Sequence, residues 1–455
     1  MVEFKQFVYS DYIHYLCKAR IYSSTIKAVV LSGIILCLVE PSVYSQVRFP
    51  IGTVSVATTD SIEVRMRLTH RFQAYNMSPE SRTDVFDKHI VSPKSVNILD
   101  HRKKFYVHAL EDHTTRVYTL YDFIPIGTIN HSFKTENEHL FRESTFENRT
   151  FKTRDNNVNQ FLGKPVESCF THGGKYLWVT YYRRSFDANA VDPSAVCIID
   201  TDTDKIVRVM PTAPLPKMIA GSPDSKILAV TNWGENTVTL LDISSADASD
   251  FKYITTITVD RKASNSFSGV SVNRDSNCDN CLRGTIFTPD GAFLLIAKMG
   301  GNGIAVIDVA NKTYIGTITG LKQNIRHLII SGQHLYLSTN KGGFIQRMVL
   351  KDLVTWIQAG NMSAPYEAIE TVDAGEGVRT IVADPTGRYL FAAANNDSKI
   401  VVIRTSDLSI VARCDVDSYP VGMDISEDGH WLITTSQERE TGGGRSVNIF
   451  HVSYQ

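Results

Sequence analysis

Short apolar runs, each alternating with polar residues, recur along most of this chain. The stretch "SKILAVTNWGENTVTLLDI" (residues 225–243) consists of two such runs around a polar loop, and "GRYLFAAANNDSKIVVIRT" (residues 387–405) repeats the arrangement. A period of two residues is typical of β-strands, and from about Ile62 onward no long segment has the helical period. The pattern therefore predicts an all-β protein.

One unit is written seven times. Each unit has an apolar strand, a polar turn resembling "PDG", a second strand, a polar loop, and a third strand rich in Val and Ile. The third strands are "TRVYTLYD", "SAVCIIDTDT", "NTVTLLDI", "NGIAVIDV", "GFIQRMVL", "SKIVVIRT" and "SVNIFHVS". A fourth strand follows most of them, as in "KIVRVMP" and "YIGTITG". Four short antiparallel strands every ~40–50 residues are the period of a propeller blade. The sequence thus predicts a seven-bladed β-propeller with four-stranded antiparallel blades.

The last unit ends at "SVNIFHVSYQ" and has no fourth strand of its own. An unpaired strand edge promotes aggregation, so a closed ring needs a partner there. The segment "SIEVRMRLTH" (residues 61–70) alternates like a strand and precedes the first unit. We expect it to supply the missing outer strand and close the ring. The predicted organisation is a leader (1–46), a lead-in with the ring-closing strand (47–90) and the propeller (91–455), with insertions at 132–164 and 261–281.

The strands "AVCIID", "GIAVID" and "KIVVIR", with "PDG" turns and the adjoining "YLWVT", resemble the YVTN-repeat, YncE-like seven-bladed propellers that bacteria export. The resemblance covers about residues 91–452. It is specific for architecture because the pattern recurs in every unit, but a fold does not determine an activity. Members of this family are mostly binding proteins of the cell envelope, with associations from nucleic acid to surface-layer architecture. The resemblance therefore implies an exported binding protein and little about its chemistry.

The first 46 residues differ from the rest. Lys18, Arg20 and Lys27 precede the apolar run "AVVLSGIILCLV", and a small residue, Ser45, follows it. This order is typical of a secretory signal peptide and predicts export. Together with the resemblance to exported bacterial propellers, it implies a periplasmic or cell-surface location in a bacterium. The run is shorter than the ~20 apolar residues of a membrane-spanning helix, although an uncleaved anchor is an alternative. A lipoprotein signal ending at Cys37 is a further alternative. The sequence "IILC" argues against it, because it lacks the small residues that normally precede such a cysteine.

One column of the aligned unit openings is rich in bases. The seven residues are Lys94, Val166, Lys217, Arg283, Arg326, Arg379 and Val421. Lys and Arg number 47 among 455 residues, so chance would put one base in the column rather than five. We expect these side chains at the mouth of the central channel, where each inner strand begins. The net charge of −1 gives no global field, so this local cluster is the main electrostatic feature.

Five converging bases need a counterpart. Two unit charges about 10 Å apart repel by roughly 0.4–1.7 kcal/mol, depending on the effective dielectric. A structural interpretation pairs the bases with acids such as Glu167. The functional interpretation is an anion site for carboxylate, phosphate or sulfate groups, to which Arg offers bidentate contacts.

Loops between the second and third strands lie on the same face of a propeller as this column. They place Asn232, Trp233, Tyr181 and Asn395 on the predicted binding face. Trp233, Tyr181 and Tyr182 would either stack on a sugar or base, or pack between blades.

The residues that carry catalysis or bind metals in known motifs are missing. Cys278 and Cys281 form a CxxC pair without a second CxxC or a following His, which favours a disulfide over a redox pair or half a metal site. No HExxH, GxSxG or CxxCH pattern occurs, so we predict no catalytic residues, metal or cofactor.

The sequence thus predicts an exported, monomeric, non-catalytic propeller. It would bind an anionic small molecule or glycan, or an envelope protein, at the basic channel mouth. Two alternatives stay open. One is a propeller hydrolase resembling lactonases, with its site assembled across blades. The other is a binder of single-stranded nucleic acid, which would use the bases and the rim aromatics.

Overall fold

The computed structural model describes residues 28–31, 34–37, 47–143, 145–146, 149–150, 159–263, 266–267, 270–437 and 444–455. The chain divides into two compact units, Met1–Ser45 and Gln46–Gln455. In the first unit, β1 (Ala28–Leu31) and β2 (Ile34–Cys37) pair as an antiparallel hairpin. The rest of the predicted leader lies outside the described residues. Across the described parts of the chain, no helix is long and apolar enough to cross a bilayer.

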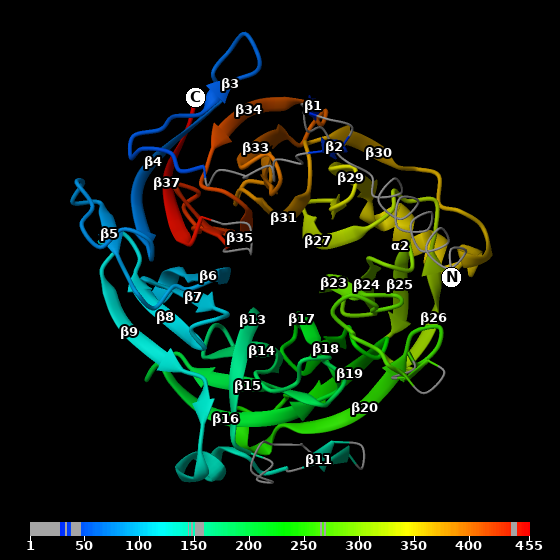
Figure 1. Ribbon diagram of the computed structural model, residues 1–455. Helices are drawn as coiled ribbons and strands as arrows, with labels where there is room; N and C mark the ends of the chain where they lie inside the picture. The colour runs from blue at the N-terminus through cyan, green and yellow to red at the C-terminus, as the bar shows by residue number, and fades with distance from the viewer. Residues whose placement is uncertain are drawn as a thin grey trace, which may run out of the picture. The chain divides into compact units, whose positions relative to one another are not determined.

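The second unit is a seven-bladed β-propeller, as predicted. Seven antiparallel sheets of four or five strands stand around a common centre, with β6, β13, β17, β23, β27, β31 and β35 innermost (Figure 1). Blade 1 contains β6 (Pro93–Leu99), β7 (Lys104–Ala109), β8 (Thr114–Thr119) and β9 (Pro125–Asn130). Blade 2 contains β13 (Phe161–Thr171), β14 (Tyr176–Arg184), β15 (Ser194–Asp200) and β16 (Lys205–Thr212). Blade 3 contains β17 (Pro216–Gly221), β18 (Ile227–Asn232), β19 (Thr237–Asp242) and β20 (Lys252–Thr258).

The remaining blades follow the same order from the centre outward. Blade 4 contains β23 (Leu282–Phe287), β24 (Phe293–Lys298), β25 (Ile304–Asp308) and β26 (Thr313–Ile318). Blade 5 contains β27 (Ile325–Ser331), β28 (His334–Thr339), β29 (Phe344–Val349) and β30 (Glu370–Asp373). Blade 6 contains β31 (Val378–Ala383), β32 (Tyr389–Ala394), β33 (Lys399–Arg404) and β34 (Ile410–Asp415). Blade 7 contains β35 (Pro420–Ile425), β36 (Trp431–Ser436) and β37 (Ser446–Tyr454).

The core lies between neighbouring blades rather than at one centre. In blade 2, Leu177, Val179 and Tyr181 pack toward blade 1, whereas Tyr176 and Trp178 pack toward blade 3. Successive side chains of a strand point to opposite faces, and both faces of these strands are covered. This explains why the second and third strands of each unit read as nearly continuous apolar runs.

The predicted ring closure is confirmed. Strand β4 (Val64–Gln73) pairs antiparallel with β37 and becomes the outer strand of blade 7, with Val64 opposite Tyr454 and Gln73 opposite Ser446. The alternating burial of β4 places Val64, Met66 and Leu68 in the core shared by blades 6 and 7. The chain end therefore has a paired neighbour, and no strand edge is left at β37.

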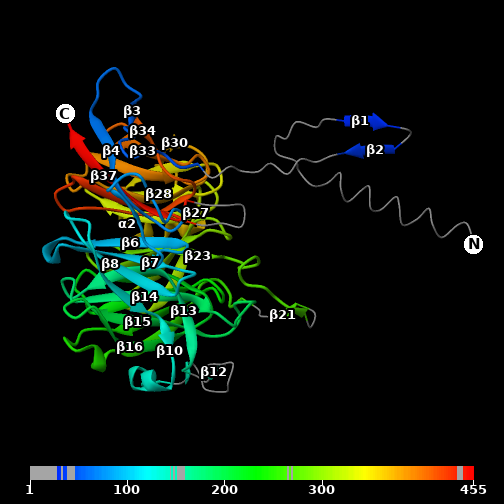
Figure 2. The same ribbon diagram turned by 60° about the vertical axis from the view of Figure 1, so that its left-hand side comes forward.

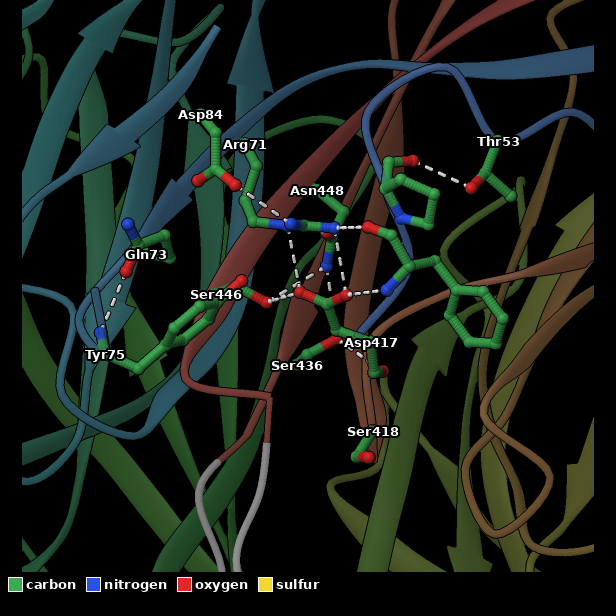
Figure 3. Close-up of polar contacts among 12 residues, drawn as sticks. Thr53, Arg71, Gln73, Tyr75, Asp84, Asp417, Ser418, Ser436, Ser446 and Asn448 are labelled. Atoms are coloured by element: carbon green, nitrogen blue, oxygen red, sulfur yellow. Dashed lines mark hydrogen bonds and ion pairs between the residues drawn. The ribbon is translucent and has the colours of Figure 1, made fainter. Parts of the chain in front are cut away.

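A buried ion pair fastens this closure. Arg71 of β4 and Asp417, just before β35, are 4% and 0% exposed, and Nε of Arg71 lies 3.0 Å from Oδ2 of Asp417 (Figure 3). Arg71 also donates to Asn448 and to the Phe49 carbonyl. The Ser446 hydroxyl and the Phe49 amide both donate to Asp417. The lead-in, the last blade and the last inner-strand loop thus meet at one polar cluster.

Several elements were not expected from the repeat. Strand β3 (Val56–Ala57) adds to the outer edge of blade 6, and β5 (Asp84–Phe86) lies parallel to β4. Helix α2 (Leu350–Gln358) interrupts blade 5 and buries Leu350, Leu353 and Ile357. Four short 3-10 turns accompany the blades: η1 (Asp100–Arg102), η2 (Thr135–Leu140), η3 (Ala248–Asp250) and η4 (Asn361–Ser363).

The two insertions carry short strands of their own. The first includes β10 (Ser132–Phe133), which pairs with β13, and the hairpin of β11 (Thr145–Phe146) and β12 (Arg149–Thr150). The second includes the hairpin of β21 (Ser266–Phe267) and β22 (Val270–Ser271), and β21 stands out from the blades in Figure 2. Residues 144, 147–148, 151–158, 264–265 and 268–269 of these insertions lie outside the described residues.

Candidate functional site

Every inner strand has a β-bulge at the same position. In blade 1, Pro93 faces Ala109 and Ser95 faces His108, so β6 has one residue more than β7 at Lys94. The same irregularity occurs in the other six inner strands. It coincides with the aligned column: Lys94, Val166, Lys217, Arg283, Arg326, Arg379 and Val421. A bulge re-aims the side chain of the extra residue, so seven equivalent bulges give the column one common geometry.

Hydroxyl groups tie the backbone of the column to the preceding blade. Thr435 of blade 7 donates to the Lys94 carbonyl, and Thr180 of blade 2 donates to the Lys217 carbonyl. Ser338 of blade 5 donates to the Arg379 carbonyl in the same way. These bonds fix each bulge against its neighbour, so the bases project from a rigid frame.

Glycine permits the close approach of the inner strands. A Cβ at Gly422 would lie 2.5 Å from the carbonyl oxygen of Lys94 and 2.7 Å from Cα of Ser95. A Cβ at Gly284 would lie 3.0 Å from the carbonyl oxygen of Arg326. Both glycines directly follow a column residue, and a larger side chain would push neighbouring inner strands apart at that level.

Aromatic rings and bases alternate in one part of the column. The Lys217 ammonium lies 3.5 Å from the centroid of the Tyr182 ring and 5.1 Å from that of Trp233. The guanidinium carbon of Arg283 lies 5.8 Å from the Trp233 centroid. Aromatic faces attract cations, and the attraction is strongest where the cation has lost water. Lys217 is only 7% exposed, so these rings take the place of part of its hydration.

One carboxylate lies among the bases. Nη2 of Arg283 is 2.8 Å from Oε1 of Glu167, and their side chains are 5% and 16% exposed. Lys94 instead donates to the neutral side-chain oxygen of Gln437 at 3.0 Å. The structure therefore brings Glu167 to Arg283, as the structural interpretation expected, while Lys94 and Lys217 have neutral neighbours in the contacts just described.

The bases are close enough to perturb one another. Burial, followed by the positive charges of Arg379, Arg326 and Arg283, lowers the pKa of Lys94 well below its ordinary value. Burial and then Arg283, Lys94 and Arg326 lower the pKa of Lys217 in the same direction. Glu167 opposes the shift in both cases. Bases from five blades thus converge on one region, and their positive charges work against each other.

Of the other predicted site residues, one lies beside the basic column and three are buried within the blades. Trp233 lies beside the column, but Tyr181 is fully buried between blades 1 and 2, with its hydroxyl 2.8 Å from Nδ1 of His131. Asn232 is also fully buried, and its amide donates to Thr237 and Thr239. The Asn395 amide donates to the carbonyl of Pro420 at 2.7 Å, which links blade 6 to blade 7. In these contacts the three side chains support the blades.

Sequence reasoning placed Tyr181 and Tyr182 on the binding face together with Trp233 and chose Tyr181 as a site residue, whereas it is Tyr182 that contacts Lys217. It also missed Gln437 and His327, both of which adjoin the column. Burial, with Arg283 and Arg326 adding to it, lowers the pKa of His327 to about 4, while Glu167 opposes the shift. A neutral His327 adds no further positive charge at neutral pH.

The CxxC pair lies next to this site. A disulfide joins Cys278 and Cys281, and both residues pack with Trp233 and Leu215. Within the described residues, no three His, Cys, Asp or Glu side chains form a group that could hold a metal ion.

No family model matches the chain, and neither does any curated protein. Among solved structures, one named Kuenenia stuttgartiensis Hydrazine Synthase is similar, with a TM-score of 0.53 and 13% sequence identity. The similarity covers 84% of this chain and 99% of that one. At this identity the comparison concerns the fold alone, and it agrees with the propeller architecture.

Proposed function

We propose that this protein is an exported, non-catalytic β-propeller that binds an anionic ligand at the basic column. The supporting observation is the convergence of Lys94, Lys217 and three arginines from five blades at equivalent bulges. Burial and then the neighbouring positive charges lower the pKa of both lysines. Binding an anion would offset this repulsion and favour the protonated form of each lysine.

The contacts favour a compact polyanion as the ligand class. A small molecule or glycan with several phosphate, sulfate or carboxylate groups would meet bases from several blades at once. Trp233 is only 9% exposed and packs with Leu215 and the disulfide cysteines, while the Tyr182 ring already contacts Lys217, so little aromatic surface is left for stacking. Binding of single-stranded nucleic acid depends on such surfaces for its bases, which argues against that alternative.

The proposed location rests on the leader and on the resemblance to exported YVTN-repeat propellers. A basic region followed by a short apolar run supports export. In a bacterial envelope, anionic glycans and envelope proteins with acidic surfaces are the partners whose chemistry suits the column.

Thermal unfolding of the full chain with a panel of anions tests this proposal. The panel comprises tripolyphosphate, citrate, a sulfated oligosaccharide and a short single-stranded DNA. The test variant is Lys94→Met/Lys217→Met. The control is Lys226→Met/Lys252→Met, which removes the same charge from side chains that are 67% and 73% exposed.

We expect a polyanion to raise the melting temperature of the parent and the control but not that of the test variant. Equal stabilisation of all three proteins would place the anion elsewhere and overturn the proposal. Stabilisation by DNA alone would favour the nucleic-acid alternative instead.

A further inference from the structure

The disulfide is built into the wall of the proposed anion site. Cys281 directly precedes β23, and Arg283 is the second residue of that strand. Cys278 and Cys281 are 8% and 7% exposed and pack against Trp233, whose ring lies between Lys217 and Arg283. The disulfide therefore contacts Trp233 through its side chains. Through its backbone it is joined directly to β23, which carries Arg283.

The backbone of the disulfide loop is held in an uncommon conformation. Asp279 and Cys281 have positive φ angles of 59° and 51°, which side-chain-bearing residues rarely adopt. Such conformations persist where the surroundings enforce them. Here the disulfide spans both residues, and breaking it removes a constraint at the residue that starts β23.

The neighbouring loop is shaped to fit the disulfide. A Cβ at Gly300 would lie 2.5 Å from Sγ of Cys281, so only glycine fits there. The amide of Met299 donates to the Cys281 carbonyl at 3.2 Å. On the blade 3 side, the backbone N–H of Asn280 donates to the side-chain oxygen of Asn236 at 3.2 Å. The closed loop is therefore clamped between blades 3 and 4.

We propose that Cys278 and Cys281 form a redox switch that sets the anion affinity of the basic column. This inference rests on the proposed anion-binding function. A dithiol supplies two electrons and two protons: its thiolate attacks one sulfur of the disulfide, a mixed disulfide forms, and its second thiol closes the dithiol into its own disulfide. Cys278 and Cys281 are left as two thiols, and the S–S bond between them is broken.

The reduced protein binds anions more weakly. Once the sulfur atoms separate, Cys281 is released toward an ordinary backbone conformation, and the start of β23 moves with it. Trp233 loses its packing partner, so the contacts that orient Lys217 and Arg283 loosen. A pre-organised set of bases binds an anion more tightly than a mobile one, because less freedom is lost on binding.

Calorimetric titration with tripolyphosphate tests the switch on the full chain. The samples are the oxidised parent, the parent reduced with dithiothreitol, and Cys278→Ser/Cys281→Ser with and without dithiothreitol. The serine variant controls for reductant effects at the remaining five cysteines of the full chain. Of these, Cys169, Cys197 and Cys414 are free thiols in the described part of the chain. Mass spectrometry after alkylation reports how far Cys278 and Cys281 are reduced in the folded protein.

We expect the reduced parent and the serine variant to bind about tenfold more weakly than the oxidised parent, a usual size for coupling between sites. Tryptophan fluorescence should rise on reduction, because a neighbouring disulfide quenches indole emission, and Trp233→Phe should remove that rise. Equal affinities in both redox states, or a disulfide that resists dithiothreitol in the folded protein, would overturn the switch. Failure of the oxidised parent to bind would instead refute the anion site itself, and the switch with it.

Discussion

The ammonium of Lys217 lies 3.5 Å from the centre of the Tyr182 ring, inside a cluster of bases contributed by five blades. Lys217 has neutral aromatic contacts there, while burial, followed by the positive charges of Arg283 and Lys94, lowers the pKa of its side chain. A lysine in this setting costs folding free energy that a ligand would offset.

Replacing Lys217 by methionine should stabilise the unliganded protein at neutral pH. Methionine keeps the contact with the rings, while the buried charge and its repulsion disappear. Exchange of buried charges for apolar residues of similar size is neutral or stabilising by about 1–4 kcal/mol, and we expect a gain of about 1–2 kcal/mol. Urea unfolding of the parent and Lys217→Met measures it.

The stability gained by Lys217→Met should depend on pH. The folded-state pKa of Lys217 is lowered, so the unfolded chain binds its proton more tightly. The destabilisation is complete below the folded pKa and fades as pH rises toward the unfolded value of about 10.4. The advantage of Lys217→Met should therefore shrink toward alkaline pH. A variant less stable than the parent at every pH would mean that Lys217 is a structural cation.

Removing one partner of the Arg71–Asp417 pair should weaken ring closure severely. Both side chains are buried, and removing one partner of a buried pair typically costs about 3–5 kcal/mol. In Asp417→Ala, Arg71 keeps its ion pair with Asp84 at 3.1 Å, while the Ser446 hydroxyl and the Phe49 amide lose their acceptor, which places the expected loss near the lower end of this range. We expect this loss for Asp417→Ala in chemical unfolding. Lys252→Ala, which breaks an exposed pair at 3.7 Å, is the control and should change stability by less than about 0.5 kcal/mol. Similar losses in both variants would contradict the role assigned to the buried cluster.

A methyl group at Gly422 should disturb the contact between blades 7 and 1. The added Cβ would meet the Lys94 carbonyl oxygen at 2.5 Å, whereas a Cβ at Gly127 would make an ordinary contact of 3.6 Å with Val117. Overpacking usually costs about 1–3 kcal/mol, so Gly422→Ala should be destabilised by that amount and Gly127→Ala hardly changed. Melting temperatures of Gly422→Ala and Gly127→Ala test this prediction. Equal values would contradict close packing of the inner strands.

Asp424 links the same two blades and should make stability depend on pH. Its carboxylate accepts from the Ile98 amide at 2.8 Å, and burial raises its pKa to about 7. A raised pKa means that the folded protein holds the proton more tightly, so stability falls as pH rises from about 4, the unfolded value, to about 7. Asp424→Asn keeps an acceptor oxygen without the charge. Its stability relative to the parent should therefore rise between pH 5 and pH 8, and a constant difference over that range would refute the assignment.

Much of the architecture could be predicted because it repeats. The alternating strands recur in register, so the alignment also predicted the basic column, and the structure adds the reason: a bulge at each of those positions. Ring closure by residues 61–70 followed from the missing strand after β37. Helix α2 escaped notice because its buried residues, Leu350, Leu353 and Ile357, span only two turns within a strand-rich unit.

The side-chain environment of the candidate site was harder to predict. Tyr181 and Tyr182 are adjacent in a strand that is covered on both faces, and successive side chains of a strand point in opposite directions. The sequence pattern does not show which of the two tyrosines faces the basic column, because both faces of the strand are apolar. Only the packing of blade 2 against its neighbours turns Tyr182 to Lys217 and Tyr181 to His131. Asn232 and Asn395 were placed on the binding face because a polar loop residue is expected to be exposed, whereas both side chains make buried hydrogen bonds.

Calorimetric titration of the full chain with tripolyphosphate, in the parent and in Lys94→Met/Lys217→Met, tests the anion site most directly. A hydrogen bond to a charged group contributes about 1.5 kcal/mol or more, which is roughly tenfold in affinity for each lysine. The account predicts one site per chain and a loss of about 100-fold in the double variant. Unchanged affinity in the variant, or no binding by the parent at millimolar anion, would contradict it.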